Sequence, residues 1–169
     1  MYHRTCVTQF SQMLTNLSAW LGKAKAHAES NDIELENLLT TRLHPNQYHL
    51  RRQIQAACDI PKLGAARLTG KEAPKHEDTD QSWDELLGRI NDVKQFLQTL
   101  DAADFEGAGE RKIPLAFAPG KYALGEDYLH QFAIPNFYFH VSMAYAILRH
   151  VGVPIGKRDL IGFMSMHDA

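Results

Sequence analysis

Cysteine is scarce in this sequence, which has only Cys6 and Cys58 and no pair spaced like the ligands of a zinc site. A disulfide framework and a structural zinc ribbon are therefore excluded, and a reducing cytoplasm is the expected location. No stretch of about 18 apolar residues occurs, and the amino terminus lacks the small-residue cleavage site of a signal peptide. We expect a protein that is neither exported by a signal peptide nor inserted in a membrane.

An excess of charge of either sign is also missing. The 18 lysine and arginine residues nearly balance the 20 aspartate and glutamate residues, so the formal net charge is −2. This balance offers no overall attraction to nucleic acid or to an anionic membrane surface, and neither partner is expected. With 11 glycines, 7 prolines and 44% hydrophobic residues, the chain is expected to form one globular domain over residues 1–169.

What the sequence does contain is helical periodicity. Apolar residues recur three and four positions apart in four segments, which places them on one face of a helix in each segment. Pro45 suits a helix boundary or the first turn of the second helix, which is expected to end near Gly70 and to bend at Pro61. The other expected helices cover residues 3–28, 82–100 and 135–151, with a shorter helical piece at 33–43.

Four amphipathic helices can bury their apolar faces only against one another, so the predicted fold is an all-α four-helix bundle. The polar connection after the second helix, GKEAPKHEDTD, can span about 36 to 40 Å and can therefore cross the bundle lengthwise. This length allows an up-down-down-up arrangement of the four helices. An ordinary antiparallel connection between the second and third helices, longer than it needs to be, is the alternative. Alternating apolar residues and the turn sequence APGK predict a small β-hairpin over residues 111–124, followed by a short turn at 126–132.

Three stretches of the chain carry a family resemblance. They read PNFYFHVSMAYAILRHVGVPIGKRDLIG at 135–162, QIQAACDIPKLGAARLTG at 53–70 and FAPGKYALGEDYLHQFAIPNF at 117–137. Over nearly its whole length the chain resembles the bacterial family called domain of unknown function nineteen ninety-three, which is similar to the DinB and YfiT-like superfamily. The resemblance implies an up-down-down-up four-helix bundle that is commonly dimeric.

Several members of that superfamily bind a divalent metal through one histidine on helix two and an HxxxH pair on helix four, and some are thiol S-transferases or hydrolases. Here the helix-four pair is incomplete, because His140 is followed four residues later by Ala144 and preceded four residues earlier by Asn136. A metal site needs at least three ligands, and an amide oxygen is a poor substitute for imidazole on zinc or nickel. The resemblance therefore implies the fold more strongly than the metal chemistry.

His140 lies at the flank of the apolar stripe of the fourth helix, and two interpretations of it stay open. It is either a metal ligand or general base in a cleft between helices, or an interior histidine hydrogen-bonded across the bundle or to Asn136. His49, near the start of the second helix, is the other candidate metal ligand, with Zn²⁺ or Ni²⁺ as the ion. A surface or helix-end histidine is the alternative for His49.

Two residues of the second helix are candidates to meet His140. If the two helices are antiparallel with level ends, His140 lies at the height of Cys58, and Gln53 flanks the other side of the same stripe. A Cys58 thiol beside an imidazole would be a candidate catalytic nucleophile, because an imidazolium lowers the pKa of a thiol. A buried and inert cysteine is the alternative.

Aromatic residues cover several faces of the fourth helix and the turn before it, more than one core stripe requires. Core packing, a ligand pocket and a dimer interface are the uses open to them. They are Phe132, Phe137, Tyr138, Phe139 and Tyr145.

We therefore predict a homodimeric protein with a ligand-binding or interaction role, in which a small molecule contacts Gln53, Asn136, Tyr138 and His140. The alternative is a metal-dependent hydrolase or thiol S-transferase that uses His140.

Overall fold

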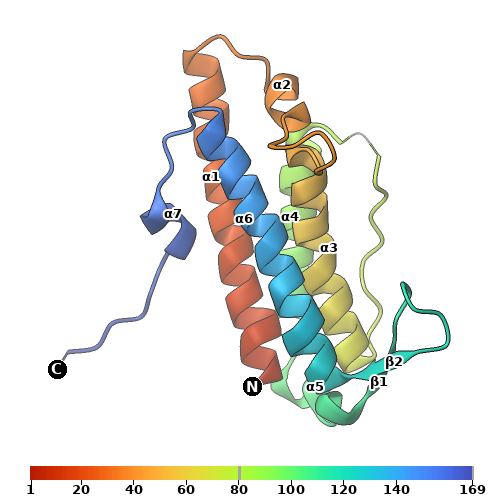
Figure 1. Cartoon of the computed structure of the whole chain (residues 1–169). Coiled ribbons are helices and arrows are strands. Elements are labelled where there is room, and N and C mark those ends of the chain that lie inside the picture. Colours follow the sequence, from red (N-terminus) through yellow and green to blue (C-terminus); the bar gives the residue numbers. More distant parts are fainter. Residues whose placement is uncertain (80, 169) are drawn as a thin grey trace.

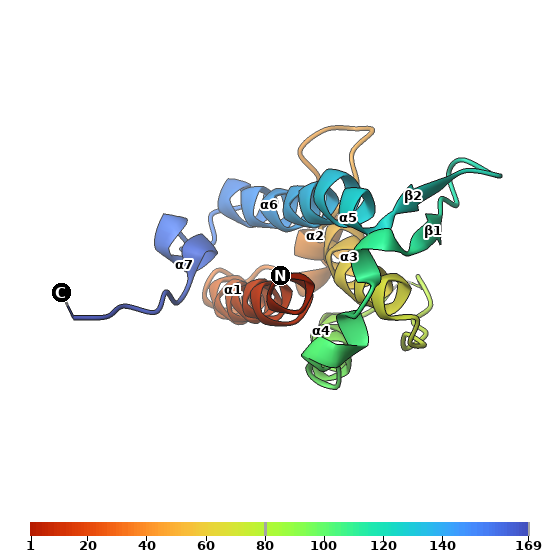
Figure 2. The ribbon, with the colours of Figure 1, turned by 90° about the horizontal axis from the view of Figure 1, so that it is seen from below.

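The structure is a computed structural model that describes residues 1–79 and 81–168. Four long helices lie lengthwise side by side in it (Figure 1). Seen from below, these helices stand around a common centre (Figure 2). The predicted all-α helical fold is confirmed. The four helices are α1 (Phe10–Ser30), α3 (Leu50–Thr69), α4 (Trp83–Gln98) and α6 (Ile134–His150).

The path of the chain through the bundle is visible in Figure 1. Helices α1 and α6 run upwards in that view, whereas α3 and α4 run downwards. Residues 70–79, which we call the crossover segment, return from the lower end of α3 to the upper end of the bundle. Helix α3 packs against both α6 and α4, so it is a common packing partner of these two helices.

The second long helix begins later than Pro45 would suggest. Its first residue is Leu50, and His49 caps it, because residues 41–49 form turns of their own. In those turns the backbone nitrogen of Leu50 donates to the carbonyl of Thr41 at 2.9 Å. The helix then continues through Pro61 and ends where Gly70 adopts a φ of 78°. The short helical piece before it, α2 (Leu35–Thr40), is also shorter than predicted.

The connection between α4 and α6 contains the predicted hairpin. Strands β1 (Lys112–Pro114) and β2 (Tyr122–Leu124) pair antiparallel, with Ile113 opposite Ala123. Two short 3₁₀ turns, η2 (Ala102–Phe105) and η3 (Ala108–Glu110), precede the strands. Behind them, α5 (Gly125–Asp127) leads into the π-helical turn η4 (Tyr128–Ala133), which continues into α6.

Short helical elements near both ends of the chain contact the bundle helices. A second π-helical turn, η1 (Arg4–Gln9), continues into α1. Near the other end, α7 (Lys157–Ile161), which the sequence patterns did not predict, packs on α1. Its backbone carbonyls accept hydrogen bonds from side chains of α1: Asn16 donates to Leu160 at 3.1 Å and Trp20 to Asp159 at 3.0 Å. Within the described residues, no helix has both the length and the apolar character required to span a membrane.

Candidate functional site

His140 points from α6 towards α3 and is only 8% exposed. Its Nδ1 lies 2.7 Å from Oε1 of Gln53, which is fully buried on α3. The Nε2 of Gln53 in turn donates to the backbone carbonyl of Tyr48 at 3.2 Å. Of the two residues of the second helix that were candidates to meet His140, the structure therefore brings Gln53 to it rather than Cys58.

This hydrogen-bond pattern assigns the proton on the His140 ring. Because the amide nitrogen of Gln53 faces Tyr48, its oxygen faces His140 and can only accept a hydrogen bond there. Nδ1 of His140 therefore carries the proton, and Nε2 presents a lone pair. Among the residues that the structure describes, none forms a hydrogen bond with this Nε2.

The His140 ring is flanked by two half-exposed aromatic side chains and lies near one cation. The Tyr48 ring stacks on it at 6.1 Å between centroids and 14° between planes, and Phe139 meets it edge-on at 5.2 Å. Burial lowers the pKa of His140 below its usual 6.5, and the positive charge of Arg52 lowers it further. The imidazole is therefore neutral at pH 7, with Nε2 available to accept a hydrogen bond.

The segment that holds Tyr48 over His140 is the turn region at residues 41–49. Tyr48 itself remains half exposed, and the Arg52 guanidinium lies 5.6 Å from the centre of its ring. Arg52 is fixed by an ion pair of 2.5 Å with Asp78 of the crossover segment. Gln47 extends from the same turn to the sulfur of Met143 on α6 at 2.8 Å. These contacts hold the turn region and the Tyr48 ring beside the imidazole.

The donors present do not fit the metal site that the superfamily implies. His49 is the N-cap of α3, and its Nδ1 accepts a hydrogen bond from the backbone nitrogen of Arg52 at 3.3 Å. Asn136, one turn before His140, supplies only an amide. No group of three or more histidine, cysteine, aspartate or glutamate side chains within the described part of the chain could hold a metal ion. Zn²⁺ and Ni²⁺ in proteins take at least three such ligands, so we derive no metal step from this site.

Cys58 does not have the properties of a nucleophile. It is fully buried in α3, and burial raises the pKa of its thiol to about 12. A thiol with such a pKa is protonated at neutral pH and does not attack electrophiles. The other cysteine, Cys6, is buried as well, and burial likewise raises its pKa to about 12. These surroundings are those of inert core cysteines.

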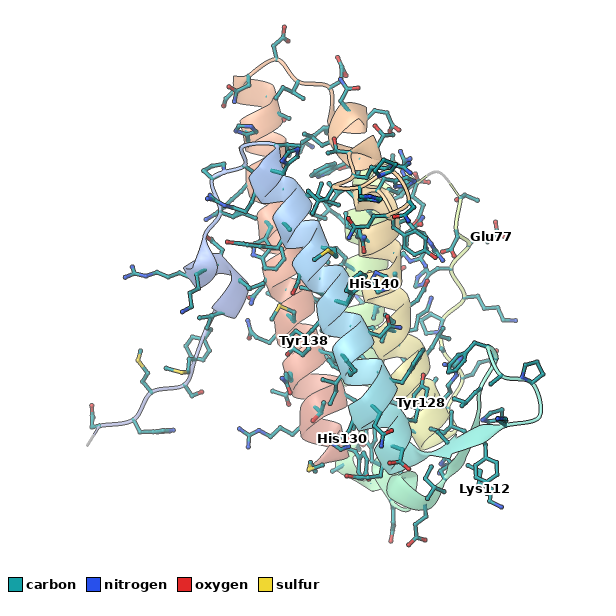
Figure 3. All side chains as sticks on the ribbon, in the orientation of Figure 1. Glu77, Lys112, Tyr128, His130, Tyr138 and His140 are labelled. Atoms are coloured by element: carbon teal, nitrogen blue, oxygen red, sulfur yellow. The ribbon has the colours of Figure 1, made fainter. Side chains whose placement is uncertain are left out.

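Tyr138 lies on the side of α6 away from Gln53. Its hydroxyl accepts a hydrogen bond from Nε2 of Gln9 at 2.7 Å, and it lines a hollow of about 680 Å³ with Arg4 and Phe163. Figure 3 shows Tyr138 towards α1 and His140 towards α3. The structure therefore does not bring Tyr138 to the other expected ligand-binding residues.

Tyr48 and Arg52 belong to the site but were not among the candidates from the sequence. Tyr48 was hidden by the shifted start of α3, since residues placed on a helix face by periodicity cannot include a turn residue. Arg52 lies on α3 outside the apolar stripe, so periodicity did not point to it. The spacing of four between an aromatic and an arginine was the one available signal, because it suits a cation–π contact across a helix start.

Comparison with known proteins places the chain beside a protein family and a solved structure. A family profile described as domain of unknown function (DUF1993) matches residues 1–161. A crystal structure of a DinB family member protein from Shewanella denitrificans is 43% identical, with a TM-score of 0.96, and the match covers 100% of this chain and 96% of that chain. No curated protein matches the chain.

Proposed function

The chain belongs to the DUF1993 family and has the fold of a DinB family member, and from that premise we propose that it binds a small molecule at His140 without a metal. The observation that carries the proposal is the lone pair on Nε2 of His140. The imidazole that carries it is oriented by Gln53 and flanked by two aromatic rings, and no described residue forms a hydrogen bond with this nitrogen. Such a group is suited to accept a hydrogen bond from an alcohol or amide.

The surroundings of His140 restrict the ligand to a small and largely uncharged one. The apolar rings of Tyr48 and Phe139 offer stacking surface, which favours a compact molecule over a long chain. Arg52 is already paired with Asp78, so it offers little unbalanced charge to an anion. His140 is only 8% exposed, but its Nε2 is not one of the buried unpaired atoms of the described residues, so a small molecule has narrow access to this nitrogen.

An enzymatic role is the alternative, and one observation favours it. A histidine whose Nδ1–H is held by a carbonyl oxygen resembles the arrangement that orients metal ligands and general bases in other proteins. The lowered pKa of His140 suits a base at neutral pH. A metal-dependent hydrolase or thiol S-transferase would therefore use His140, and Zn²⁺ or Ni²⁺ would need further ligands, because the described residues gather no set of three.

Metal analysis separates the two roles. Protein purified without a histidine tag is analysed for bound metal and then melted with Zn²⁺ or Ni²⁺ added. The proposal expects no stoichiometric metal and no stabilisation that depends on His140. Stoichiometric metal that is lost in His140→Ala, with His130→Ala as an exposed-histidine control, would overturn it.

Nuclear magnetic resonance tests ligand binding directly. Long-range proton–nitrogen spectra report the tautomer of His140, and a panel of small alcohols and primary amides is screened against them. A donor that reaches Nε2 stabilises the neutral ring, so the pKa of His140 falls further on binding. If every member of the panel leaves the His140 signals unchanged while other sites respond, the proposed site is wrong.

A homodimer formed through apolar contacts is part of the proposal. Beyond α7 the chain extends away from the bundle, and Phe163, Met164 and Met166 are exposed on it (Figure 1). Exposed apolar side chains favour association, and such contacts do not weaken in salt as ion pairs do. Sedimentation at micromolar concentration should show a dimer at low salt and at about 1 M salt. A 19.1 kDa species in both would refute the dimer.

A further inference from the structure

A second hollow lies at the lower end of the bundle, beside the hairpin and away from His140. In Figure 3, Tyr128 marks its position near β1 and β2, while His140 lies much farther up α6. The hollow has a volume of about 170 Å³. It is lined by Arg67, Pro114, Leu115, Ala116, Phe117, Tyr128 and Phe132. We call this hollow the hairpin slot.

Three aromatic rings form the walls of the hairpin slot. Phe117 and Phe132 stack at 5.3 Å between centroids and 26° between planes, and Tyr128 lies 5.5 Å from Phe132. Tyr128 and Phe132 both belong to the π-helical turn η4. Single π-helical turns are rare and occur frequently at functional sites. The wall is therefore built from an unusual backbone segment and not from a regular helix face.

Phe117 is held in position although it is largely exposed. It is 67% exposed, in the loop that joins β1 to β2. Hydrogen bonds within that loop keep its shape: Leu115 donates to Lys121 at 3.1 Å, and Ala118 donates to Leu115 at 3.0 Å. A large apolar ring that an ordered loop keeps in contact with water is a surface on which a ligand can gain free energy by burial.

Arg67 supplies a cation at the edge of the hairpin slot. Its Nη1 donates to the Tyr128 hydroxyl at 2.7 Å, and the guanidinium lies 5.7 Å from the centre of the Tyr128 ring. Among the described residues Arg67 forms no ion pair with a carboxylate, in contrast to Arg52 and Arg89. Most of its five donors are therefore free, and their fork geometry suits a carboxylate.

We propose that the hairpin slot binds a small monocarboxylate with one aromatic ring, its ring against the wall formed by Phe117, Phe132 and Tyr128 and its carboxylate on Arg67. The volume of about 170 Å³ is below the usual 300–1,000 Å³ of ligand pockets, so a single ring is the largest body that it accepts. This inference goes beyond the function proposed at His140, because the two sites share no residue.

Benzoate is the probe for this proposal, and benzamide is its uncharged counterpart of the same shape. Both are titrated into the full chain and followed by two-dimensional proton–nitrogen spectra. We expect benzoate to shift the backbone signals of residues 114–117 and 128–132 in a saturable way. The dissociation constant of benzamide should be at least about tenfold higher than that of benzoate, because benzamide cannot form charge-assisted hydrogen bonds to Arg67.

Three variants identify the groups responsible. Arg67→Gln should remove the preference for benzoate over benzamide, and Phe117→Ala should weaken both probes. Lys75→Gln is the matched control, because it removes an exposed cation from the neighbouring hollow that also borders Arg67. All three positions are exposed, so thermal melts should show intact folding.

Three results would overturn the proposal. Linear, unsaturated shifts with both probes would mean that no site exists, and equal affinity for benzoate and benzamide would exclude a carboxylate site. Shifts confined to the surroundings of His140 would assign benzoate to the other site and leave the hairpin slot without a ligand. If benzoate binds at the hairpin slot and the His140 signals do not shift, the proposal for the hairpin slot is supported. The function proposed at His140 is then tested separately by its own ligand panel.

Discussion

Helix α3 carries buried polar side chains on two of its sides, and the two sides treat them differently. Towards α4 and the crossover segment, charged groups meet charged groups: Arg89 of α4 pairs with Asp59 at 2.7 Å and with Asp78 at 3.0 Å. Towards α6, a neutral amide meets a neutral imidazole, Gln53 and His140. The charged contacts hold the crossover segment against the bundle. On the other side, Nε2 of His140 forms no hydrogen bond with a described residue.

Most donors of the charged side have partners, although Nε of Arg89 is a buried donor that forms no hydrogen bond with a described residue. Arg89 is 2% exposed and also donates to the carbonyl of Glu77 at 3.0 Å. Lys62, equally buried, lies 2.9 Å from Asp59 and 2.8 Å from Nδ1 of His76. Buried charges are tolerated only when they are paired in this way. The network therefore explains how a long polar segment is held against the bundle without an apolar core of its own.

The neutral side is built for a different use. The amide nitrogen of Gln53 donates to the carbonyl of Tyr48, and its amide oxygen accepts from Nδ1 of His140. Nε2 of His140 forms no hydrogen bond with a described residue. Nε2 of His140 is not one of the buried atoms that lack a hydrogen-bond partner among the described residues, so it reaches the surface, where a ligand can meet it. This difference places the candidate site on the α6 side and a structural role on the α4 side.

The largest expected effect is the loss of Arg89. Arg89→Ala should lower the free energy of unfolding by about 3 to 5 kcal/mol, because it leaves Asp59 and Asp78 without their buried partner. Urea melts measure the change. Arg158→Ala, an exposed arginine on α7, is the control and should change stability by less than about 0.5 kcal/mol. Equal effects of both variants would mean that the charged side does not fasten the chain.

Core truncations give the scale for this loss. Leu17 and Ile90 are buried at the middle of their helices, on α1 and α4. Leu17→Ala and Ile90→Ala should each cost about 2 to 5 kcal/mol in urea melts, through lost apolar burial and the cavity left behind. Losses below about 0.5 kcal/mol for both would contradict the packing of the bundle.

These core positions were predictable from sequence because helical periodicity is local. A stripe of apolar residues marks the buried face whatever the partner helix is, so Leu17 and Ile90 could be placed before any contact was known. The hairpin was predictable for the same reason, from alternation and a turn sequence. The start of α3 was not, since Pro45 suits a helix start and a turn equally well, and the hydrogen bond between Leu50 and Thr41 decided for the turn.

The two sides of α3 differed in predictability as well. Wheel geometry reduced the partners of His140 to Cys58 and Gln53 but could not choose, because the choice depends on the rotation and offset of two helices. Arg89 gave no signal at all, since its partners Asp59 and Asp78 lie 30 and 11 residues away in sequence. Helical periodicity predicts which face of a helix is buried, but it does not predict which side chains from distant segments pair with each other.

Replacing Gln53 tests the neutral side. Gln53→Leu removes the acceptor of Nδ1–H and should cost about 1 to 3 kcal/mol in urea melts. Gln53→Glu places a carboxylate there instead, so the pKa of His140 should rise, opposite to the direction in the native protein. Proton spectra of the histidine ring measure that pKa. An unchanged pKa in Gln53→Glu would mean that Gln53 does not face His140 in solution.

Acid tests the charged side through His76. Burial lowers its pKa below 6.5, and the facing Lys62 lowers it further, although Asp92 at 3.5 Å opposes them. The unfolded chain then binds more protons just below pH 6.5, so stability is complete above about pH 6.5 and falls as the pH falls.

His76→Asn should flatten this dependence in urea melts between about pH 5 and 7.5. His140 has a lowered pKa as well and contributes in the same direction, so the slope that remains in His76→Asn should be reduced again in His76→Asn with His140→Gln. A stability that stays constant from pH 7.5 to 5, or increases towards acid, would show that neither ring is held neutral by the fold.

The smallest effect on stability is expected at Tyr48, where the consequence is chemical. Its ring is half exposed, so Tyr48→Ala should cost no more than about 1 kcal/mol. Removing the ring opens His140 to water, and because burial is the main cause of its lowered pKa, that pKa should move back towards 6.5. Tyr48→Phe keeps the ring and should leave the pKa where it is. If the two variants titrate alike, Tyr48 does not cover the imidazole, and the neutral side of α3 owes its character to Gln53 alone.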